Sequence, residues 1–572
     1  MGLVLCGAFA EVISLGAVLP FIGILISPDR AFRLPVVANF ARVLGITSPH
    51  QLLLPLTIAF VAAALIAGAI RLLLLWASIR LAFATGADLG IDVYRRSLYQ
   101  PYRVHVALNS SEVISVITSK VGDTVTVLTQ MLMLISSLVM LVAITLALLA
   151  IDPVVALLAT AGFGSCYGLI TLLSRRQLRL NSERISSEQP RLVKAVQEGL
   201  GGIRDVLLDG TQPVYSDIYR RADYPLRRAQ GANMFISTSP RFAMEALGMV
   251  VIAALTYGLS RQSGGLATAL PVLGALAVGA QRLLPALQQG YNAWSSVASC
   301  EASLAKTIEL LDQPLPEELL QPAPAPLQFQ SAVRFNRVRF RYTGDGPWVL
   351  NDLSFTIRKG TRVGFVGSTG SGKSTALDLL MGLLMPTEGE LLVDNEPVTG
   401  SRVRAWQRSI AHVPQSIYLA DTTLAENIAF GVPREAIDLE RVRRAARQAQ
   451  IAEFIESRLE GYDVSVGERG IRLSGGQRQR IGIARALYKQ ASVLVFDEAT
   501  SALDNATEQS VMDAIDGLDR DLTIVLIAHR LTTVRRCDTI IELQNGRLVA
   551  QGTYEQLLEC SPSFRSMVRV VA

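Results

Sequence analysis

The two halves of the chain differ in how hydrophobic and polar positions alternate. The first half contains apolar runs about as long as the roughly 20 residues that an α-helix needs to cross a bilayer. Six such runs, the last three weaker than the first three, lie near residues 2–26, 53–79, 128–150, 154–174, 242–260 and 266–288. The pattern therefore predicts an α-helical transmembrane bundle of six spans within residues 1–312.

Between these runs, residues 80–126 and 175–240 are too polar for lipid but keep helical periodicity. We expect them to be long cytoplasmic extensions of the spans. Their turning points, near Gln100–Tyr102 and Gly210–Pro213, are expected to be short helices that rest on the second domain of the chain. Such helices would carry movement from one domain to the other.

A proline-rich segment separates the two halves. Gln313-Pro-Leu-Pro is followed by Pro322-Ala-Pro-Ala-Pro, a composition typical of a stiff, extended linker. We expect a linker at 313–327 and a second domain at 328–572. In that domain the apolar run Val493–Phe496 is typical of a strand buried in a parallel sheet, so the domain is expected to be α/β.

Composition and charge support a membrane-bound first half. Hydrophobic residues make up 50% of the chain and the mean hydropathy is +0.35, which is high for a soluble protein of 572 residues. Residues 1–312 hold 24 Lys and Arg against 18 Asp and Glu, whereas the whole chain holds 54 and 49. The net positive charge therefore belongs to the first half. It favours contact with anionic lipid over nucleic acid, for which no basic motif with interleaved aromatic residues is visible.

Basic residues also predict the orientation of the spans. Clusters follow the second and fourth runs and precede the fifth, whereas the turn at 150–153 has no basic residue. By the positive-inside rule these clusters are cytoplasmic. They comprise Arg95, Arg96, Arg103, Arg175, Arg176, Arg179, Arg220, Arg221, Arg227 and Arg228.

The five cysteines show no metal-ligand spacing. Two of them fall in apolar runs, so free buried thiols are expected rather than disulfides. The chain opens directly into an apolar run without a basic n-region, a pattern that does not predict a cleavable signal peptide.

A glycine-rich loop follows the predicted strand Arg362–Val366 and opens a helix at Lys373. Backbone N–H groups and the helix N-terminus would converge there on phosphate oxygens. Lys373 can neutralise the β- and γ-phosphates of ATP, and the Ser374 hydroxyl can ligate Mg²⁺. The predicted phosphate-binding residues are Gly367, Ser368, Thr369, Gly370, Ser371, Gly372, Lys373, Ser374 and Thr375.

Two adjacent carboxylates end the strand Val493–Phe496, at the edge where parallel sheets bind their ligands. Asp497 is expected to lie on the Mg²⁺ side of the site. Glu498 is expected to polarise the attacking water, a general-base role worth about 10²–10⁴ in rate. The glycine-rich loop and the acidic pair together predict a site that hydrolyses ATP.

The stretch Leu473-Ser474-Gly475-Gly476-Gln477 is a second candidate anion site, because two glycines and a serine open a helix. One chain thus has two phosphate-binding elements and a single lysine loop. With these motifs, residues 328–572 resemble the nucleotide-binding domain of the ATP-binding-cassette (ABC) superfamily. The resemblance implies that two such domains close head to tail. Each nucleotide then lies between one lysine loop and the opposite Ser474–Gln477 stretch.

The resemblance implies roles for further residues. Tyr342 corresponds to the aromatic residue that stacks on adenine, and Gln415 to the glutamine that links Mg²⁺ and water to the membrane domain. Asp504 belongs to the segment that crosses the dimer interface, and His529 corresponds to the residue that contacts the γ-phosphate. The alternative interpretations are a core tyrosine on an edge strand for Tyr342 and a structural histidine for His529.

The resemblance also implies how the chain assembles. Six spans ahead of one nucleotide-binding domain is the layout of an ABC exporter half-transporter. The stretch Ser465–Gly470 resembles one that touches the membrane domain in exporters. Importers are disfavoured, since they usually carry spans and cassette on separate chains. Because Glu498, the Ser474–Gln477 stretch and His529 are all intact, two copies would form two competent sites, which favours a homodimer.

As an exporter, the protein is expected to be integral to the bacterial inner membrane, with the nucleotide-binding domain in the cytoplasm. Exporters of this type usually begin with a polar amphipathic helix, which the start of this chain does not resemble. Two explanations stay open: the natural start lies upstream, or that helix is dispensable.

Charged side chains within spans cost about 2.5–3.5 kcal/mol at mid-helix on insertion scales, so they are functional candidates. Glu11, Arg71 and Arg282 lie within the predicted spans. Two interpretations stay open. The arginines snorkel or pair with an acid such as Glu11, or they line a site for an anionic headgroup, since Arg binds phosphate oxygens bidentately. Arg241 is a further candidate for such a site.

Several stretches resemble the exporter subgroup that includes bacterial flippases of lipid-linked oligosaccharides. They are Glu11–Gly16, Leu19–Phe21, Tyr99–Tyr102, Asn109–Glu112, Ser239–Arg241 with Glu245, and Arg282–Pro285. The resemblance implies an amphipathic anionic lipid or glycolipid as substrate, such as a lipid-linked oligosaccharide. A multidrug, lipid or peptide exporter of the same architecture and a non-transporting, membrane-anchored ATPase remain as alternatives.

Overall fold

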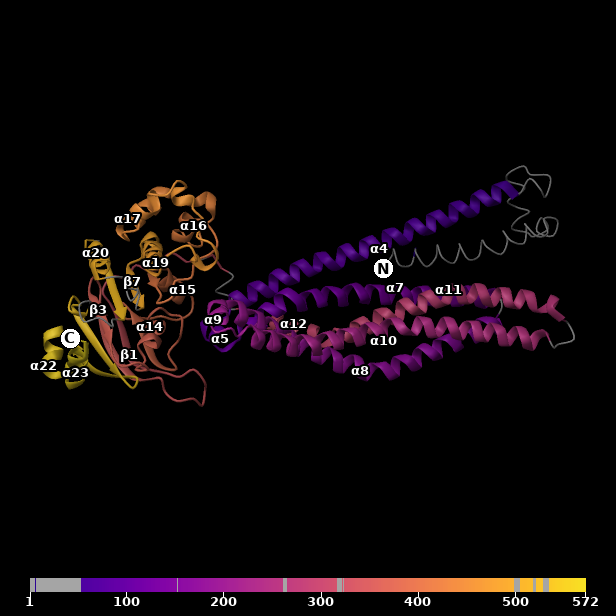
Figure 1. The fold of residues 1–572 in the computed structure, drawn as a ribbon, viewed down its shortest axis with the longest axis horizontal. Helices are drawn as coiled ribbons and strands as arrows, with labels where there is room; N and C mark the ends of the chain where they lie inside the picture. The colour runs from indigo at the N-terminus through magenta and orange to yellow at the C-terminus, as the bar shows by residue number, and fades with distance from the viewer. Residues whose placement is uncertain are drawn as a thin grey trace. The chain divides into compact units, whose positions relative to one another are not determined.

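The computed structural model describes Cys6 and residues 53–151, 153–260, 265–315, 321–322, 324–497, 505–517, 521–527 and 534–571. The chain divides into two compact units, whose elements are labelled in Figure 1. The first unit comprises Met1–Gln100 and Leu108–Pro314, and the second comprises Pro101–Ala107 and Leu315–Ala572. The change of unit after Pro314 falls within the predicted linker.

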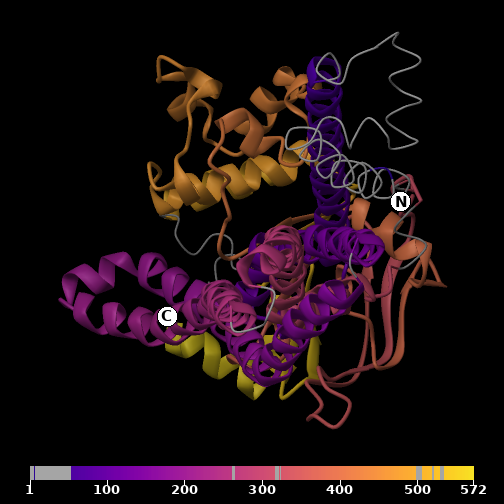
Figure 2. The same ribbon diagram turned by 90° about the vertical axis from the view of Figure 1, so that its right-hand side faces the viewer.

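The first unit is a bundle of long helices, which Figure 2 shows nearly end-on. Helix α11 packs against α7, α8 and α10, and α8 packs against α10. The helices run well past the length of a span, as the prediction of polar extensions requires. The described long helices are α4 (Leu53–Leu98), α7 (Val121–Ile151), α8 (Pro153–Gly201), α10 (Gln212–Ser260) and α11 (Gly265–Ser299). Shorter ones are α6 (Ser110–Ser115), the π-helical turn η2 (Val116–Lys120), α9 (Ile203–Leu208) and α12 (Glu301–Leu311).

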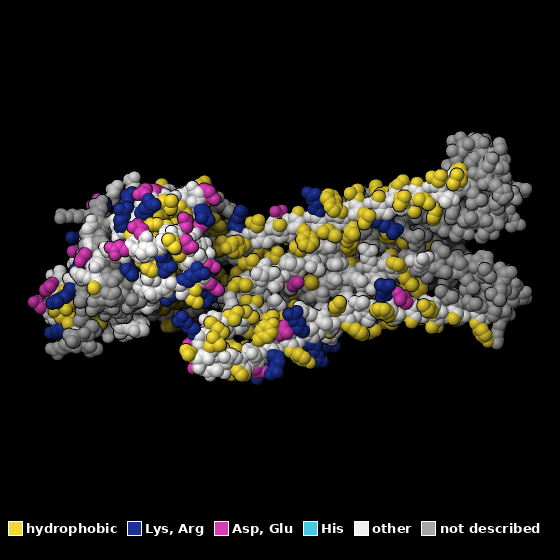
Figure 3. Space-filling view, turned by 45° about the horizontal axis from the view of Figure 1, so that its top comes forward, with side chains coloured by type: hydrophobic (Ala, Val, Ile, Leu, Met, Phe, Trp, Pro, Cys, Tyr) yellow, Lys and Arg dark blue, Asp and Glu magenta, His cyan; other side chains and the backbone are white. Residues whose placement is uncertain are grey.

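Many hydrophobic side chains are exposed along the helices of this bundle, as the yellow groups on the face drawn in Figure 3 show. Among the described residues two helical stretches, Phe60–Leu98 and Ser110–Leu149, are long and apolar enough to cross a membrane by length and composition. The predicted run at 2–26 lies outside the described residues. The last three predicted runs lie within α8, α10 and α11.

The two turning points differ slightly from the prediction. Tyr99 and Gln100 form the turn, and the short helix α5 (Tyr102–Ala107) follows Pro101. The second short helix, α9, comes before Gly210 rather than around it, because Gly210 has φ 63° and α10 already begins at Gln212. A residue in the left-handed region ends a helix, so the turn follows α9. Helix α5 belongs to the second unit and α9 to the first.

The second unit contains a six-stranded sheet in the order β10-β9-β3-β8-β7-β6 and a four-stranded antiparallel sheet in the order β2-β1-β4-β5. In the larger sheet all neighbours are parallel except β10 and β9. Its strands are β3 (Arg362–Val366), β6 (Ile410–Val413), β7 (Val493–Asp497), β8 (Thr523–Ile527), β9 (Thr539–Gln544) and β10 (Arg547–Gly552). The smaller sheet holds β1 (Ala332–Phe340), β2 (Leu350–Arg358), β4 (Glu388–Val393) and β5 (Glu396–Pro397).

The position of strand β7 in the sheet explains why all four residues from Val493 to Phe496 are apolar. Val493 and Val495 pack into the core shared with the antiparallel sheet, whereas Leu494 and Phe496 pack into the core beneath the helices on the opposite face. Successive residues of a strand face opposite sides, so a strand covered on both sides needs an unbroken apolar run. The predicted buried parallel strand is confirmed.

Helices cover this sheet and join its strands. Those described are α14 (Lys373–Leu380), α15 (Ser401–Arg408), α16 (Leu424–Ile428), α17 (Leu439–Gln448), α18 (Ala452–Glu456), α19 (Gly475–Lys489), α20 (Asn505–Asp516), α22 (Tyr554–Cys560) and α23 (Pro562–Val571). The end of the predicted linker is attached to α15. Leu327 N donates to Ala405 O at 3.0 Å, and Ser409 Oγ donates to Leu327 O at 2.9 Å. The linker therefore enters the second unit as an anchored segment.

Candidate functional site

The loop from Gly367 to Gly372 joins β3 to α14 in a shape that requires glycine at both ends. Gly367 has φ 148°, and a Cβ there would lie 2.2 Å from Leu543 O. Gly372 has φ 99°, and a Cβ there would lie 2.6 Å from Leu350 Cδ2. Residues with a side chain rarely adopt either φ value, and their Cβ would clash at either position. The glycines let the loop turn tightly before α14, whose N-terminal N–H groups can then bind phosphate.

Lys373 and Ser371 lie at the centre of this loop. Lys373 is 7% exposed, and its Nζ donates to Gly367 O at 2.8 Å and to Ser368 O at 3.0 Å. Ser371 is buried, and its Oγ has no hydrogen-bond partner among the described residues. An ammonium group and an unsatisfied hydroxyl beside a helix N-terminus form a set of donors that fits a chain of phosphates.

The parallel strands place the predicted Mg²⁺ ligands at one edge of the sheet. Ser374 follows β3, Asp497 ends β7 and Gln415 follows β6, so all three lie at the carboxyl ends of parallel strands. Val413 of β6 pairs with Phe496 of β7, which puts Gln415 beside the acidic strand end. Hydroxyl, carboxylate and amide oxygens suit Mg²⁺, which also keeps water and phosphate oxygens as ligands. The residues at this edge fit the ion.

Asp378 is a functional candidate that the motifs did not identify. It lies on α14 after the lysine loop and is half-buried. Burial, together with the charge of Asp497, raises the pKa of Asp378 to about 6. Perturbed carboxyl groups gather at functional sites. The signal in the sequence is an acid surrounded by the apolar helix residues Ala376, Leu377, Leu379 and Leu380.

Tyr342 lies beside the first turn of α14. Its hydroxyl is 3.5 Å from Thr375 Oγ1, and its ring packs edge-on against Phe340 with the ring centres 5.0 Å apart. The residue is 37% exposed, so it is not a buried core tyrosine. The structure thus brings Tyr342 next to the lysine loop with part of its ring open for a base to stack on.

Helix α5 lies against this part of the second unit. The guanidinium of Arg103 donates to the backbone oxygen of Tyr342. Burial, followed by the charge of Asp378, raises the pKa of Tyr102. The sequence predicted a short helix resting on the ATPase domain but no residue that makes the contact. The contact joins α5 to the tyrosine predicted to hold adenine.

The Ser474–Gln477 stretch opens α19 through a reciprocal cap. Gln477 N donates to Ser474 Oγ at 3.2 Å, and Ser474 N donates to Gln477 Oε1 at 2.9 Å. Both side chains therefore satisfy the N-terminus of their own helix. For a phosphate brought by a second copy, the backbone N–H groups of Gly475 and Gly476 and the positive end of a 15-residue helix remain.

Several predicted residues lie outside the described part of the chain: Glu11, Glu498, Asp504 and His529. Arg282 lies in α11, but its side chain is not among those described. Arg71 is exposed on α4. The roles assigned to these residues stay predictions.

A cavity of about 620 Å³, lined by both polar and apolar side chains, lies among α7, α8, α10 and α11 of the first unit. Arg241 lines it and pairs with Glu245 at 2.9 Å. Tyr167 donates to Gln288 Oε1 at 2.7 Å, and Gln288 Nε2 donates to Asn292 Oδ1 at 3.1 Å. The other lining residues are Gln130, Met133, Met244, Gln281, Leu284, Pro285 and Gln289.

Carboxamides dominate the polar part of this cavity, and the sequence prediction missed them. It selected charged residues, of which Arg241 lines the cavity and Arg71 does not. Gln281, Gln288 and Asn292 recur along α11 at helical spacing, a signal that they share one face. Carboxamides both donate and accept hydrogen bonds, so this lining suits groups rich in hydroxyls.

Comparison with known proteins agrees with this geometry. Residues 350–501 match the family described as ABC transporter. The chain is 33% identical over 411 residues to an ATP-dependent lipid A-core flippase of Alkalilimnicola ehrlichii. The matched region covers 72% of this chain and 69% of that protein. A flippase of the same name from Xanthomonas oryzae is 34% identical over 419 residues, covering 73% and 68%.

A solved structure of a bacterial Atm1-family ABC exporter with ATP bound is similar over almost the whole chain. The TM-score is 0.78 and the sequence identity 26%, with 98% of this chain and 97% of that chain covered. The similarity thus extends over the helical first unit as well as the sheets of the second.

Proposed function

We propose a lipid-exporting function for this chain, which belongs to the ABC transporter family and has the fold of an ABC exporter half-transporter. Its second unit hydrolyses ATP, and the hydrolysis is coupled to transport by the helical first unit. The proposed substrate is a lipid-linked oligosaccharide or a related anionic glycolipid, moved across the bacterial inner membrane.

The cavity of the first unit, with its carboxamides and Arg241, is the observation that carries the proposal. It lies in a bundle that exposes many large apolar side chains, and it combines several carboxamides with Arg241. Carboxamides suit the hydroxyls of a glycan, and Arg suits phosphate oxygens. A phosphate would compete with Glu245 for Arg241, so the glycan contacts would have to supply part of the affinity. The relatives named lipid A-core flippases act, by their name, on another glycolipid.

The proposed chemistry at the nucleotide site follows from the donors described above. Lys373 and the N–H groups of the loop bind and orient the phosphates, and Tyr342 holds the base. Ser374, Gln415 and Asp497 would hold Mg²⁺, which when bound neutralises charge developing on the phosphate oxygens. Glu498 would orient the attacking water, and His529 would contact the γ-phosphate. Closure of the site and its release after hydrolysis would alternate two arrangements of the membrane helices.

We further propose that the functional form is a homodimer with head-to-tail nucleotide sites, as the single lysine loop and single Ser474–Gln477 stretch require. The exposed apolar face of α9 supports a partner, since Leu207 is 60% and Leu208 82% exposed on a short polar extension where lipid is not expected. Asp504 would lie at the interface. Native mass spectrometry of the purified protein tests this assembly, and a mass of one copy at working concentration would contradict it.

ATPase activity in proteoliposomes tests the transport proposal. We expect a polyprenyl-pyrophosphate oligosaccharide to stimulate hydrolysis by the wild type and not by Glu498→Gln. Arg241→Ala should weaken the stimulation, whereas Arg227→Ala should not, because Arg227 pairs with Asp223 elsewhere on α10. Lipid A-core, tested in parallel, distinguishes the two glycolipids. Robust activity that ignores both lipids would overturn the substrate and leave the ABC exporter in place.

A second candidate substrate, a hydrophobic drug or peptide, is favoured by the apolar part of the same lining. Met133, Met244 and Leu284 could adapt to varied apolar groups, as methionine-rich surfaces do. Stimulation of the ATPase by hydrophobic cations or peptides, and not by glycolipids, would favour this candidate. Hydrolysis that no substrate stimulates and no transport accompanies would instead favour the membrane-anchored ATPase.

A further inference from the structure

A cavity of about 550 Å³ lies in the second unit, away from the ATP site. It opens at the edge of the large sheet where β7 and β8 begin, lined there by Ser492 and Leu522. The lysine loop and Asp497 lie at the other edge, where the parallel strands end. The two sites are thus separated by the length of the strands.

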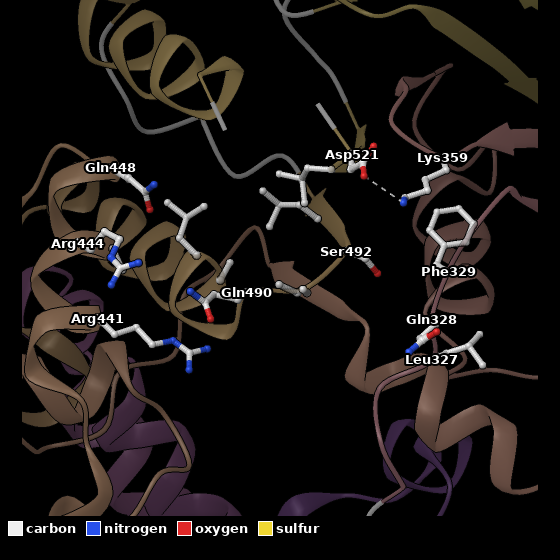
Figure 4. Close-up of a pocket in the computed structure, with 17 residues that line it drawn as sticks. Leu327, Gln328, Phe329, Lys359, Arg441, Arg444, Gln448, Gln490, Ser492 and Asp521 are labelled. Carbon is white, nitrogen blue, oxygen red and sulfur yellow. Dashed lines mark hydrogen bonds and ion pairs between the residues drawn. The ribbon is translucent and has the colours of Figure 1, made fainter. Parts of the chain in front are cut away.

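The cavity is walled by three parts of the chain, shown in Figure 4. Arg441, Arg444 and Gln448 come from α17, and Gln490 follows α19 on the same side. The end of the linker, Leu327–Phe329, and Lys359 face them from the other side. A ligand held there would touch the linker, the sheet edge and the helices at once.

The charges of this lining are not balanced. Lys359 pairs with Asp521 at 3.4 Å, so that pair is neutral. Arg441 and Arg444 have no carboxylate within ion-pair distance among the described residues, although Arg443 on the same helix pairs with Glu440 at 2.6 Å. Arg441 Nε is also buried without a hydrogen-bond partner in the described part of the chain. Two adjacent guanidinium groups on one wall therefore lack a counter-charge.

The remaining lining is mostly apolar. Phe329, Leu327 and Leu522 are joined by Ala411, Ala445, Ala486, Leu487, Ala491 and Leu494. The Arg441 guanidinium lies 4.5 Å above the centre of the Tyr488 ring, which holds it in place without neutralising it. An ion that is unpaired and partly buried gains most from a charged partner.

We propose that this cavity is a binding site for a small amphiphilic anion, with a carboxylate or phosphate on Arg441 and Arg444 and an apolar body against Phe329 and Leu522. It is independent of the nucleotide and of the transported lipid. Because its walls include the linker end and α17, an occupant ties the linker to the sheet edge. Binding therefore protects both segments from local opening.

Isothermal titration of the full-length protein, with the ATP sites saturated by a non-hydrolysable ATP analogue, tests the proposal. The probes are 2-naphthoate, 2-naphthyl phosphate and the neutral 2-naphthamide. We expect the anions to bind and the amide not to. The combined Arg441→Gln and Arg444→Gln variant should bind the anions at least about tenfold more weakly, the effect of losing one or two charge-assisted hydrogen bonds. The stronger of the two anions identifies the headgroup as carboxylate or phosphate.

Matched variants serve as controls for the position and for the charge of the two arginines. Arg443→Gln removes a paired arginine of the same helix and should bind like the wild type, whereas Arg441→Lys with Arg444→Lys keeps the charge and should retain most of the affinity. Hydrogen exchange should slow over 327–329 and 439–448 when 2-naphthoate binds. Equal binding of the amide, undiminished binding by the glutamine variant, or no binding of either anion would overturn the proposal.

Discussion

The first unit exposes large apolar side chains on its surface, whereas the second unit buries them in its core. On α8, Leu172 is 73% exposed, whereas Trp406 and Phe365 of the second unit are fully buried. Both units bury polar groups that have partners: Asn181 and Asn233 of the first unit bond to each other at 2.7 Å, and Asn427 Nδ2 of the second donates to Ala420 O at 3.0 Å. The difference in apolar exposure indicates two solvents: lipid favours apolar groups on the outside, whereas water favours their burial.

The largest expected effect tests whether ATP hydrolysis in the second unit supplies the energy for transport by the first. Lys373→Ala removes the ammonium group at the centre of the lysine loop and should lower ATP turnover by about 10²–10³-fold, as loss of one charge-stabilising donor does at other sites. Transport, located in the first unit, should fall in parallel. The thermal midpoint without nucleotide serves as the folding control. Transport that continues without ATP hydrolysis would show that the two units are not coupled.

The contrast in exposure can be tested directly. Trp406→Ala should destabilise the protein by about 3–5 kcal/mol, because it empties a buried site and removes the hydrogen bond from Trp406 Nε1 to Leu380 O at 2.7 Å. Leu172→Ala should cost less than about 0.5 kcal/mol, as surface substitutions do. Denaturant unfolding in detergent measures both. Equal costs would mean that Leu172 is covered in the folded protein.

The buried polar pair of the first unit gives a smaller effect with a distinctive pattern. Asn181→Ala leaves Asn233 buried without its donor and should cost about 1–3 kcal/mol. Replacing both asparagines with leucine should cost much less than the sum of the single changes, since no polar group is then left unpaired. Thermal unfolding followed by circular dichroism measures the series. Additive losses would show that the two side chains act separately.

The smallest expected effect concerns Asp378 in the second unit. Its folded-state pKa is raised to about 6, so the folded protein holds this proton more tightly than the unfolded chain does. Stability from this group is therefore greatest at low pH and is lost as pH rises from the ordinary carboxyl pKa through about 6. Without nucleotide, Asp378→Asn should raise the thermal midpoint most at pH 8, less at pH 5, and not at all below the ordinary carboxyl pKa. An equal shift at pH 8 and pH 5 would rule out this titration.

Much of the nucleotide site was predictable because its chemistry depends on consecutive residues. The strand Arg362–Val366, the loop to Ser374 and the helix from Gly475 all follow from local patterns, and each lies where expected. Asp378 was not predicted, because its raised pKa arises from burial in the folded domain and then from the charge of Asp497, which is distant in sequence. The cavity of the first unit was missed for the same reason, since its lining comes from four helices.

By itself, the sequence determined the two units, the family motifs and the order of the nucleotide-binding elements, because hydrophobic period, glycine and proline act over short stretches of chain. Tertiary structure alone decided which polar side chains share a cavity, which arginines of α17 face no carboxylate of the described residues, and that the linker end is anchored to α15. These outcomes depend on distances between segments that are far apart along the chain. Packing sets those distances, and local pattern does not encode them.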